Sequence, residues 1–396
     1  MAAEIRVARP EELEALVALD FRNFGAVPDA GDVEEVRGEL DLSRFLVAEE
    51  GGRLVAAGGS YEMELTLPGG GQVPVSGVTW VSVAASHRRR GLLRRLMDGL
   101  DELSAGFGDP VMALTASEAG IYERFGYGPA TSTRVIEIDR RRTSIHPRWR
   151  PEPVDLVVAQ DCVPELLALW DRFRRSQPGE VSRNEALFRA LCLRRDRPDY
   201  AALHGDGYAI YRIDPDWADG HPAHRLQVKE LVALTPEAHL ALWHLILSVD
   251  LVGPVRSLRA VSVDDPLPHL LTDPRALRTT DLNDGLWVKV TDAARCFGAR
   301  TYRGDDELVL GVVPTVDDLV RGADPTEIVT VSPDGCHPDD RSPDLVVCRP
   351  ALGPLLLGAG ATGLARARRL RAEPGVLDRA DVLLGTTVAA DCRTSF

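Results

Sequence analysis

Apolar residues in the first 140 positions form short runs that alternate with sets at helical spacing. The runs are bounded by glycine-containing turns and polar segments, a pattern that predicts strands. These strands are expected at residues 5–8, 45–48, 54–57, 62–67, 78–84, 111–115 and 132–138. Helices are predicted after Pro10-Glu11-Glu12, over 91–103 and near 119–125. Strands and helices in this mixed order indicate an α/β or α+β domain.

The second half of the chain repeats part of this layout. Residues 227–259 predict a strand, a helix that starts with the Thr235 cap and Pro236, and a second strand. The order and lengths match those of residues 78–115, and we interpret the match as an internal duplication. The second copy lacks the arginine- and glycine-rich loop of the first.

From about residue 286 the pattern changes again. LWVKVTDAARCFGARTY predicts a strand followed by a helix, and the remainder predicts a third, smaller α/β unit. Its strands are expected at 308–313 and 345–348, and its short helices at 351–357 and 362–370. The basic, proline-rich segment 140–153 is typical of a linker. A length of 396 residues allows two to three domains, and we expect three, at 1–145, 146–285 and 286–396.

Charge and composition limit the partners. The chain has 46 Lys and Arg against 60 Asp and Glu, a net charge of −14 that would repel phosphate backbones and excludes a general nucleic-acid binder. The start of the sequence lacks a signal-peptide pattern, and the longest uncharged stretch, 351–365, is too short to span a bilayer. The six cysteines form no CxxC pair. We expect a cytoplasmic protein with no membrane partner and no metal.

Acidic residues are concentrated near the beginning of the chain. Residues 1–50 hold 13 acids and 5 arginines, a balance suited to a cationic substrate. Phe21 and Phe24 are candidates for the walls of an amine-binding pocket, with core packing as the alternative. The acidic candidates for that pocket, with solvated surface as the alternative for most, are Asp29, Asp32, Glu34, Glu35, Glu39 and Asp41.

The segment from Val78 to Asp98 carries the clearest chemistry. A β-branched strand leads into SHRRRG, and a helix begins at Gly91. A helix N-terminus presents free N–H groups and the positive end of its dipole, which together bind phosphate. Arginines at positions 88, 89, 90, 94 and 95 add positive charge. In an acidic chain this reversal indicates an anionic ligand; the alternative is a solvated arginine cluster on an ordinary loop.

This strand–RRRG–helix unit resembles motif A of the Gcn5-related N-acetyltransferases (GNAT), whose usual form is R/Q-x-x-G-x-G/A. Leu93 stands where the last small residue is usual, which is a departure. A second block, ASEAGIYERFGYGPAT, resembles the segment where these enzymes place their general acid, here Tyr122. Together with LWVKVTDAARCFGARTY, these blocks resemble the Eis (enhanced intracellular survival) family of aminoglycoside N-acetyltransferases over nearly the whole chain.

The resemblance implies tandem GNAT domains followed by a sterol-carrier-protein-like domain, an α/β (α+β) fold assembled as a homohexamer. It also implies acetyl-CoA as co-substrate. Strand positions whose backbone would pair with the pantetheine arm fall on Val81, Ser82 and Val83. The pyrophosphate loop and a further cofactor contact fall on Arg89, Arg90, Gly91, Leu92, Leu93, Arg94, Ser117 and Glu118.

The mechanism implied by the resemblance is direct attack of an amine on the thioester. Tyr122 would protonate the leaving thiolate, and the C-terminal carboxylate of Phe396 would accept a proton from the amine. A phenol is a neutral acid at pH 7, as the first role requires. An α-carboxylate has a pKa near ~3.5, so the second role needs desolvation or neighbouring acids. The alternatives are a packing role for Tyr122 beside Phe125 and Tyr127, and a frayed terminus at Phe396.

Three functions are open at this point. The first is acetylation of amines on polycationic small molecules such as aminoglycosides. The second is acetylation of protein lysines or polyamines. The third is a non-enzymatic scaffold that binds a lipid or a partner. Gly91, Tyr122 and Phe396 argue against the third, because a decayed enzyme need not keep all of them.

Overall fold

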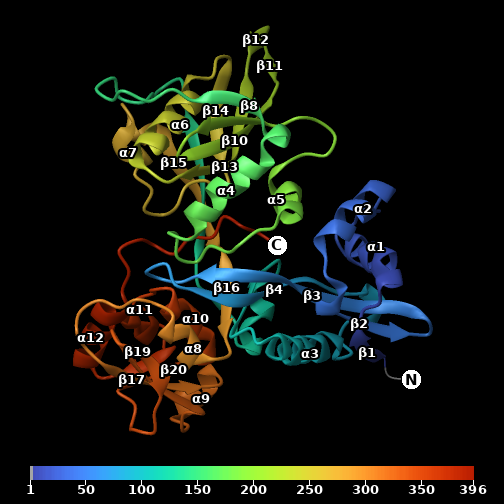
Figure 1. Ribbon diagram of the computed structural model, residues 1–396, viewed down its shortest axis with the longest axis vertical. Coiled ribbons are helices and arrows are strands. Elements are labelled where there is room, and N and C mark those ends of the chain that lie inside the picture. The colour runs from blue at the N-terminus through green and yellow to red at the C-terminus, as the bar shows by residue number, and fades with distance from the viewer. Residues whose placement is uncertain (1–2) are drawn as a thin grey trace. The chain divides into compact units, whose positions relative to one another are not determined.

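The structure, a computed structural model, describes residues 3–396 and contains two compact units (Figure 1). The first unit contains the chain up to Ala130, Leu286–Gly385 and Phe396. The second contains Thr131–Gly285 and Thr386–Ser395. The chain therefore leaves the first unit after Ala130 rather than near residue 145. The division into three domains stays a prediction.

The first unit is built on a seven-stranded sheet of order β1-β2-β3-β4-β5-β16-β6. Its strands are β1 (Glu4–Val7), β2 (Phe45–Glu50), β3 (Arg53–Thr66), β4 (Gln72–Val83), β5 (Val111–Thr115), β6 (Gly128–Pro129) and β16 (Leu286–Val290). The two strands predicted at 54–57 and 62–67 are one continuous strand, β3. β4 and β5 form the parallel pair in this sheet.

β16 corrects the sequence-based expectation that residue 286 opens a separate unit. The strand lies between β5 and β6 and pairs antiparallel with both. All five of its residues are buried, including Lys289, whose ammonium is paired with Asp101. Burial on both faces is typical of a strand inside a sheet, but a short apolar run does not identify its partner strand.

Three helices accompany this sheet: α1 (Leu13–Asn23), α2 (Ala30–Glu39) and α3 (Leu92–Phe107). Figure 1 shows α3 running beside the sheet, and it packs on the sheet through a buried stripe at helical spacing, formed by Leu92, Leu96, Met97 and Leu100. α2 was not predicted because Val36 is its one buried residue, so it lacks an apolar stripe.

The remainder of the first unit is a five-stranded sheet of order β19-β18-β17-β20-β21 with short helices. Its strands are β17 (Leu308–Val313), β18 (Glu327–Ser332), β19 (Gly335–Pro338), β20 (Leu345–Cys348) and β21 (Leu370–Ala372). Its helices are α8 (Ala293–Gly298), α9 (Val316–Arg321), α10 (Arg349–Leu356), α11 (Ala361–Arg366) and α12 (Pro374–Leu384). The helix predicted at 362–370 is thus α11 followed by the start of β21.

The second unit contains another seven-stranded sheet, of order β15-β7-β14-β13-β10-β9-β8. Its strands are β7 (Ser132–Asp139), β8 (Asp155–Val158), β9 (Tyr200–His204), β10 (Gly207–Asp214), β13 (His224–Ala233), β14 (Val252–Ser257) and β15 (Leu277–Asp284). β11 (Trp217–Ala218) and β12 (His221–Pro222) form a separate ribbon. β7 was expected to end the first domain; it belongs instead to this sheet, between β15 and β14.

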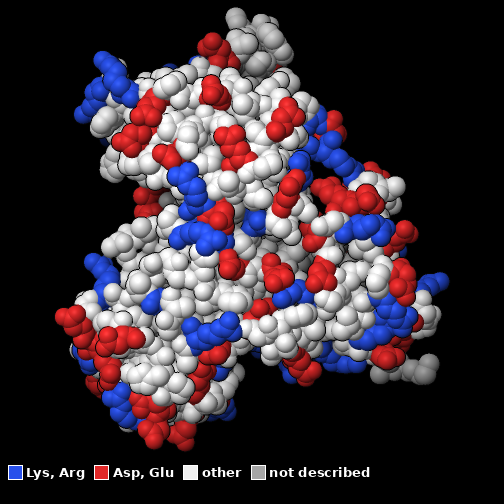
Figure 2. Space-filling view, viewed as in Figure 1, with Lys and Arg blue, Asp and Glu red and all other residues white. Residues whose placement is uncertain are grey.

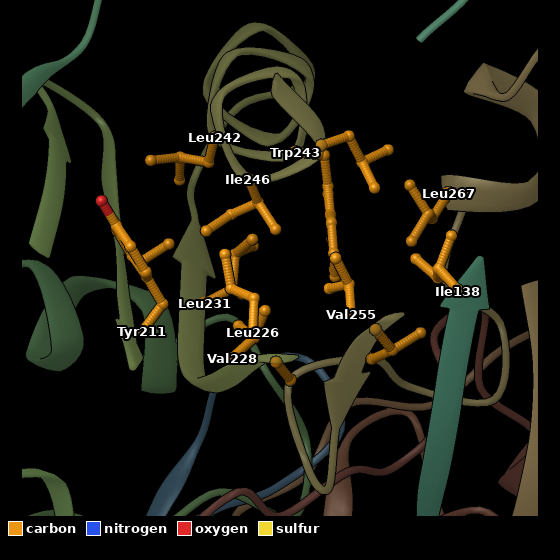
Figure 3. Close-up of a cluster of buried hydrophobic side chains, with 14 of the residues drawn as sticks. Ile138, Tyr211, Leu226, Val228, Leu231, Leu242, Trp243, Ile246, Val255 and Leu267 are labelled. Atoms are coloured by element: carbon orange, nitrogen blue, oxygen red, sulfur yellow. The ribbon is translucent and has the colours of Figure 1, made fainter. Parts of the chain in front are cut away.

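The helices of the second unit are α4 (Val163–Arg174), α5 (Glu185–Cys192), α6 (Pro236–Ser248) and α7 (Leu267–Leu270). Figure 3 shows Trp243 of α6 extending toward Val255 of the sheet and Ile246 toward Leu231, and Leu242 belongs to the same buried cluster. The predicted strand–helix–strand repeat is therefore present as β13, α6 and β14, with β13 and β14 parallel.

The face of the molecule seen in Figure 2 carries charged side chains of both signs. Figure 2 shows acidic and basic residues interspersed on the visible face, with a group of acids over the position of α2.

Within residues 3–396, no helix combines the length and apolar character needed to cross a membrane.

Candidate active site

The candidate site of the first unit lies where β4 and β5 separate. The two strands pair over three positions, residues 75–77 with 111–113. Past these positions, the ends of the strands line two cavities that share residues. In open α/β sheets, ligands bind at the carboxyl ends of parallel strands, and this opening has that position.

A β-bulge shapes β4 at this opening. The register between β3 and β4 shifts between Ala57 and Gly59, and Trp80 has a φ of +55°. A positive φ is unusual for a bulky residue, and a bulge bends a strand and redirects its side chains. Val81, which follows the bulge, lines both cavities.

The larger cavity, of about 570 Å³, extends from β4 to the start of α3 and the segment after β5. Ten of the eleven predicted cofactor residues line it: Val81, Ser82, Val83, Arg89, Gly91, Leu92, Leu93, Arg94, Ser117 and Glu118. Arg88, Arg124 and the aromatic ring of Phe125 complete part of its wall. Its positive side chains lie beside a helix N-terminus, as an anionic ligand requires.

Arg90 is not among the described residues that line this cavity. Its guanidinium donates to both carboxylate oxygens of Glu50, at 3.0 and 2.9 Å. Nε2 of His87 lies 2.9 Å from the same carboxylate. Hydrogen bonding from Arg90, and then the charges of Arg90 and His87, lower the pKa of Glu50. Arg90 therefore ties the loop to β2.

Gly91 determines how the helix begins. It is the N-cap of α3 with a φ of +79°, a left-handed conformation that favours glycine. A Cβ atom at this position would meet nothing within 4 Å, so the backbone angle rather than space requires glycine. The N–H groups of the first turn have no intrahelical acceptors and are available to a ligand. With Arg89 and Arg94 alongside, this cavity fits a pyrophosphate-bearing cofactor.

The smaller cavity, of about 160 Å³, is lined by both strands and by the last residue of the chain. β4 contributes Val78, Thr79, Trp80 and Val81, and β5 contributes Leu114 and Thr115. The residues shared with the larger cavity are Phe24, Val81, Ser117 and Tyr122. The two cavities therefore meet at Tyr122.

Tyr122 lies between two short 3₁₀ turns, Ala119–Ile121 and Glu123–Phe125. Its ring packs edge-on against Tyr127, with ring centroids 6.1 Å apart. Burial, and then the charge of Glu118, raise the pKa of the Tyr122 phenol above its usual value of 10.0. The phenol is therefore protonated at neutral pH and able to donate a proton.

Phe396 is held by contacts through its backbone and its ring. Oγ1 of Thr115 donates to the backbone oxygen of Phe396 at 2.5 Å, and the Phe396 N–H donates back to the same hydroxyl at 3.2 Å. The ring packs edge-on against Tyr61, with centroids 6.1 Å apart. A Cβ atom on Gly77 would lie 3.1 Å from this ring, so Gly77 leaves room for it.

Asp20 is a site residue that sequence reasoning did not single out. It lines the smaller cavity and accepts a hydrogen bond from Ser82 Oγ at 2.5 Å. Burial raises the pKa of Asp20, against the lowering effect of the Ser82 hydrogen bond. Asp20 follows Leu16 and Val17 at helical spacing, which places an acid on the buried face of α1. That position is the feature of the sequence that could have identified Asp20 as a site residue.

The described residues that line the two cavities include none of the six acids predicted between positions 29 and 41. Asp29 and Asp32 form the capping box of α2. Glu39 accepts a hydrogen bond from the hydroxyl of Tyr61. Phe24, predicted as a possible wall of the amine pocket, does line both cavities and is largely exposed.

The chain is similar to known N-acetyltransferases in sequence and in fold. Residues 4–130 and 179–295 each match a model described as an acetyltransferase (GNAT) domain. The chain is 39% identical over 378 residues to an uncharacterized N-acetyltransferase of Streptomyces avermitilis, covering 89% of this chain and 88% of that protein. It is 35% identical over 366 residues to N-acetyltransferase Eis of Mycobacterium tuberculosis, covering 88% and 87%. The crystal structure of Eis1 from Mycobacterium abscessus superimposes with a TM-score of 0.87 at 32% identity, covering 99% of this chain and 100% of that one.

Proposed function

Because the chain belongs to the Eis family of GNAT enzymes and is an acetyl-CoA-dependent N-acetyltransferase, we propose that it acetylates amines of polycationic small molecules such as aminoglycosides. Tyr122 acts as the general acid and the C-terminal carboxylate of Phe396 as the general base. The observation that carries this proposal is the position of Tyr122, which lines both cavities, while Phe396 lines the smaller one.

Acetyl-CoA, when bound, supplies the acetyl thioester. The residues that would hold it are those of the larger cavity. The backbone of Val81, Ser82 and Val83 would pair with the pantetheine arm, and the first turn of α3 with Arg89 and Arg94 would bind the pyrophosphate, since these residues line one cavity. Binding there would direct the thioester toward Tyr122.

The smaller cavity has the chemistry to recognise an amine. The Asp20 and Phe396 carboxylates supply negative charge, and the rings of Phe24 and Trp80 supply faces that attract cations. Phe396 accepts a proton from the amine, and Tyr122 donates its phenolic proton on the side shared with the larger cavity. Family membership sets aside the non-enzymatic scaffold as the main function.

Direct comparison of acceptors tests the proposed substrate class. Mass spectrometry after incubation with acetyl-CoA and kanamycin, spermine or a lysine peptide should show kanamycin acetylated with the highest kcat/KM. Asp20→Asn should raise the KM for kanamycin about ten-fold, or ~1.4 kcal/mol, because it removes a buried charge facing the amine. A lysine peptide or spermine that outranks kanamycin would replace the proposed substrate by the corresponding alternative.

The cofactor-binding role of the loop has its own test. Arg94→Ala should raise the KM for acetyl-CoA about ten-fold, since hydrogen bonds to charged groups contribute about 1.5–3 kcal/mol and this site is partly exposed. Arg90→Ala is the matched control, because Arg90 pairs with Glu50 and should change that KM less than two-fold. Equal effects of the two substitutions in steady-state kinetics would contradict the assignment.

We further propose, on the family resemblance, that the part of the chain with the sheet β19-β18-β17-β20-β21 is a sterol-carrier-protein-like domain. The same resemblance supports assembly as a homohexamer in the cytoplasm.

A further inference from the structure

The second unit has its own opening between parallel strands. β13 and β14 pair up to Val228 and Ser257, and the pairing ends there. Just past this point a cavity of about 180 Å³ is lined by residues of the second unit alone, among them Lys229, Arg259 and Ser395. It occupies the position in this sheet that the smaller cavity of the first unit occupies between β4 and β5.

The second GNAT domain lacks the phosphate-binding loop of the first. The helix that follows β13 starts at Thr235, whose hydroxyl accepts a hydrogen bond from the N–H of Ala238 at 3.2 Å. This side chain takes one of the donors that a pyrophosphate would use. The cavity at the strand ends is therefore open to a different, smaller ligand.

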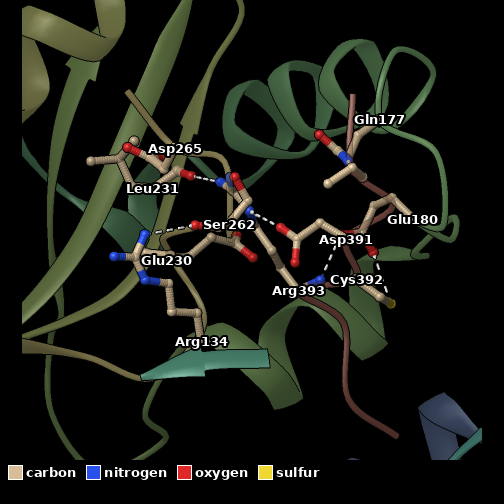
Figure 4. A network of polar contacts seen from close by, with 12 residues as sticks. Arg134, Gln177, Glu180, Glu230, Leu231, Ser262, Asp265, Asp391, Cys392 and Arg393 are labelled. Carbon is tan, nitrogen blue, oxygen red and sulfur yellow. Dashed lines mark hydrogen bonds and ion pairs between the residues drawn. The ribbon is translucent and has the colours of Figure 1, made fainter. Parts of the chain in front are cut away.

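The lining of this cavity is strongly basic. Four cations, Arg183, Lys229, Arg259 and Arg393, face one acid, Glu230. Nη1 of Arg183 is paired with Glu230 at 2.8 Å. Figure 4 shows Arg393 directed toward Asp391, to which it is paired at 3.3 Å. Two of the four cations are therefore neutralised by neighbouring carboxylates.

Lys229 and Arg259 are not neutralised. Neither side chain has an ion pair or a hydrogen bond with any residue that the structure describes, and Nη1 of Arg259 is buried without a partner. The acids nearest Lys229 are engaged elsewhere: Glu230 with Arg183, and Asp199 with Arg212. Burial is the main cause of a lowered pKa at Lys229. Both side chains are half-buried, and an unpartnered cation that has lost part of its hydration costs free energy that a bound anion would offset.

We propose that this cavity binds a small tetrahedral oxyanion of the phosphate class, with Lys229 and Arg259 as its two charge partners. Two uncompensated positive charges match the charge of a phosphate dianion. The volume of about 180 Å³ holds a phosphate, free or as a small ester, and is too small for coenzyme A. The tail residues Arg393 and Ser395 close one side, three and one positions before Phe396.

The scarcity of lysine gives a direct test. Lys229 and Lys289 are the two lysines of the chain, and Lys289 is paired with Asp101 in the first unit. The full-length protein labelled with ¹³C at the lysine ε-carbon should show two resonances, assigned with Lys229→Met. Addition of inorganic phosphate at constant ionic strength should shift the Lys229 resonance in a saturable manner and leave Lys289 in place.

Substitutions outside the catalytic site distinguish binding from ionic strength. Arg259→Met should lower phosphate affinity at least ten-fold, and Arg259→Lys should recover most of it. Arg256→Met is the matched control, because Arg256 is an exposed residue of β14 that does not line the cavity, and it should bind as the wild type does. Circular dichroism and thermal denaturation of each full-length variant report whether it is folded, since Lys289 lies in the first unit and both substituted positions lie in the second.

Parallel titrations with glycerol 3-phosphate and succinate identify the ligand chemistry. Saturable binding of inorganic phosphate supports the proposal. If glycerol 3-phosphate also binds in its own titration, the site accepts an esterified phosphate; if it does not, the site is specific for the free ion. A Lys229 resonance that does not respond to either phosphate, that responds to succinate alone, or that responds equally in Arg259→Met would overturn it. Such a result would leave the proposed acetyl transfer in the first unit unchanged, because the two proposals concern different cavities.

Discussion

Replacement of Tyr122 by phenylalanine should lower kcat for coenzyme A release by about 10²–10⁴-fold, the contribution of a positioned general acid. The substitution removes one hydroxyl at the junction of the two cavities and leaves the ring that packs against Tyr127. The KM for acetyl-CoA should change little, because the cofactor contacts assigned to Arg89 and Arg94 remain. Thiol release followed with a colorimetric reagent measures both constants.

Tyr127→Phe is the matched control for that experiment. Tyr127 is fully buried, and its hydroxyl lies 3.7 Å from Met112 Sδ. The substitution therefore also removes a phenolic hydroxyl, but from a residue that lines neither cavity. This variant should keep kcat within a few-fold of the wild type. Similar rates for Tyr122→Phe and the wild type, with both proteins folded by circular dichroism, would remove Tyr122 from the mechanism.

The pH profile gives a second readout of the same group. Burial raises the pKa of Tyr122, so the protonated, donating form persists to a higher pH than for a free phenol. The midpoint of any activity loss through deprotonation of Tyr122 should therefore lie above pH 10.0 and not near neutrality. A fall in kcat between pH 8 and 9 would have to come from another group.

The local parts of the site were predictable from the sequence because they depend on neighbours along the chain. The strand, the RRRG loop and the helix start at Gly91 are specified within about 20 residues, and the helix does begin there. Arg90 is the exception within the loop. Its alternative partner, Glu50, lies 40 positions earlier, and nothing in the local sequence reveals the pair.

The predictions that were wrong concern pairing between segments that are distant in the sequence. β7 and β16 were predicted as strands but were assigned to the wrong sheets. An apolar run indicates that a strand is buried, but it does not indicate which strand is its partner. The same limit applies to Thr115, whose hydroxyl contacts a residue 281 positions away. Asp20 was missed for a different reason: a single acid on a helix has no motif around it.

Lengthening of the chain by one glycine after Phe396 should lower kcat/KM for the amine by at least about 100-fold, as expected for a displaced general base. One residue moves the terminal carboxylate by up to about 3.8 Å, which is beyond hydrogen-bond reach of its former position. The Phe396 backbone oxygen that Thr115 holds would then belong to an uncharged peptide group. Steady-state kinetics with saturating acetyl-CoA measure the loss.

Two further variants separate charge from packing at this terminus. A protein with an amidated C-terminus, made by ligation, keeps the length and the ring but removes the charge, and it should lose as much activity as the extended chain. Phe396→Leu keeps the carboxylate and loses the edge-on contact with Tyr61, so its kcat should stay within about ten-fold of the wild type. If the amidated protein keeps full activity while Phe396→Leu does not, the last residue acts by packing. The proton acceptor would then be another group of the smaller cavity, and Asp20 is the other carboxylate that lines it.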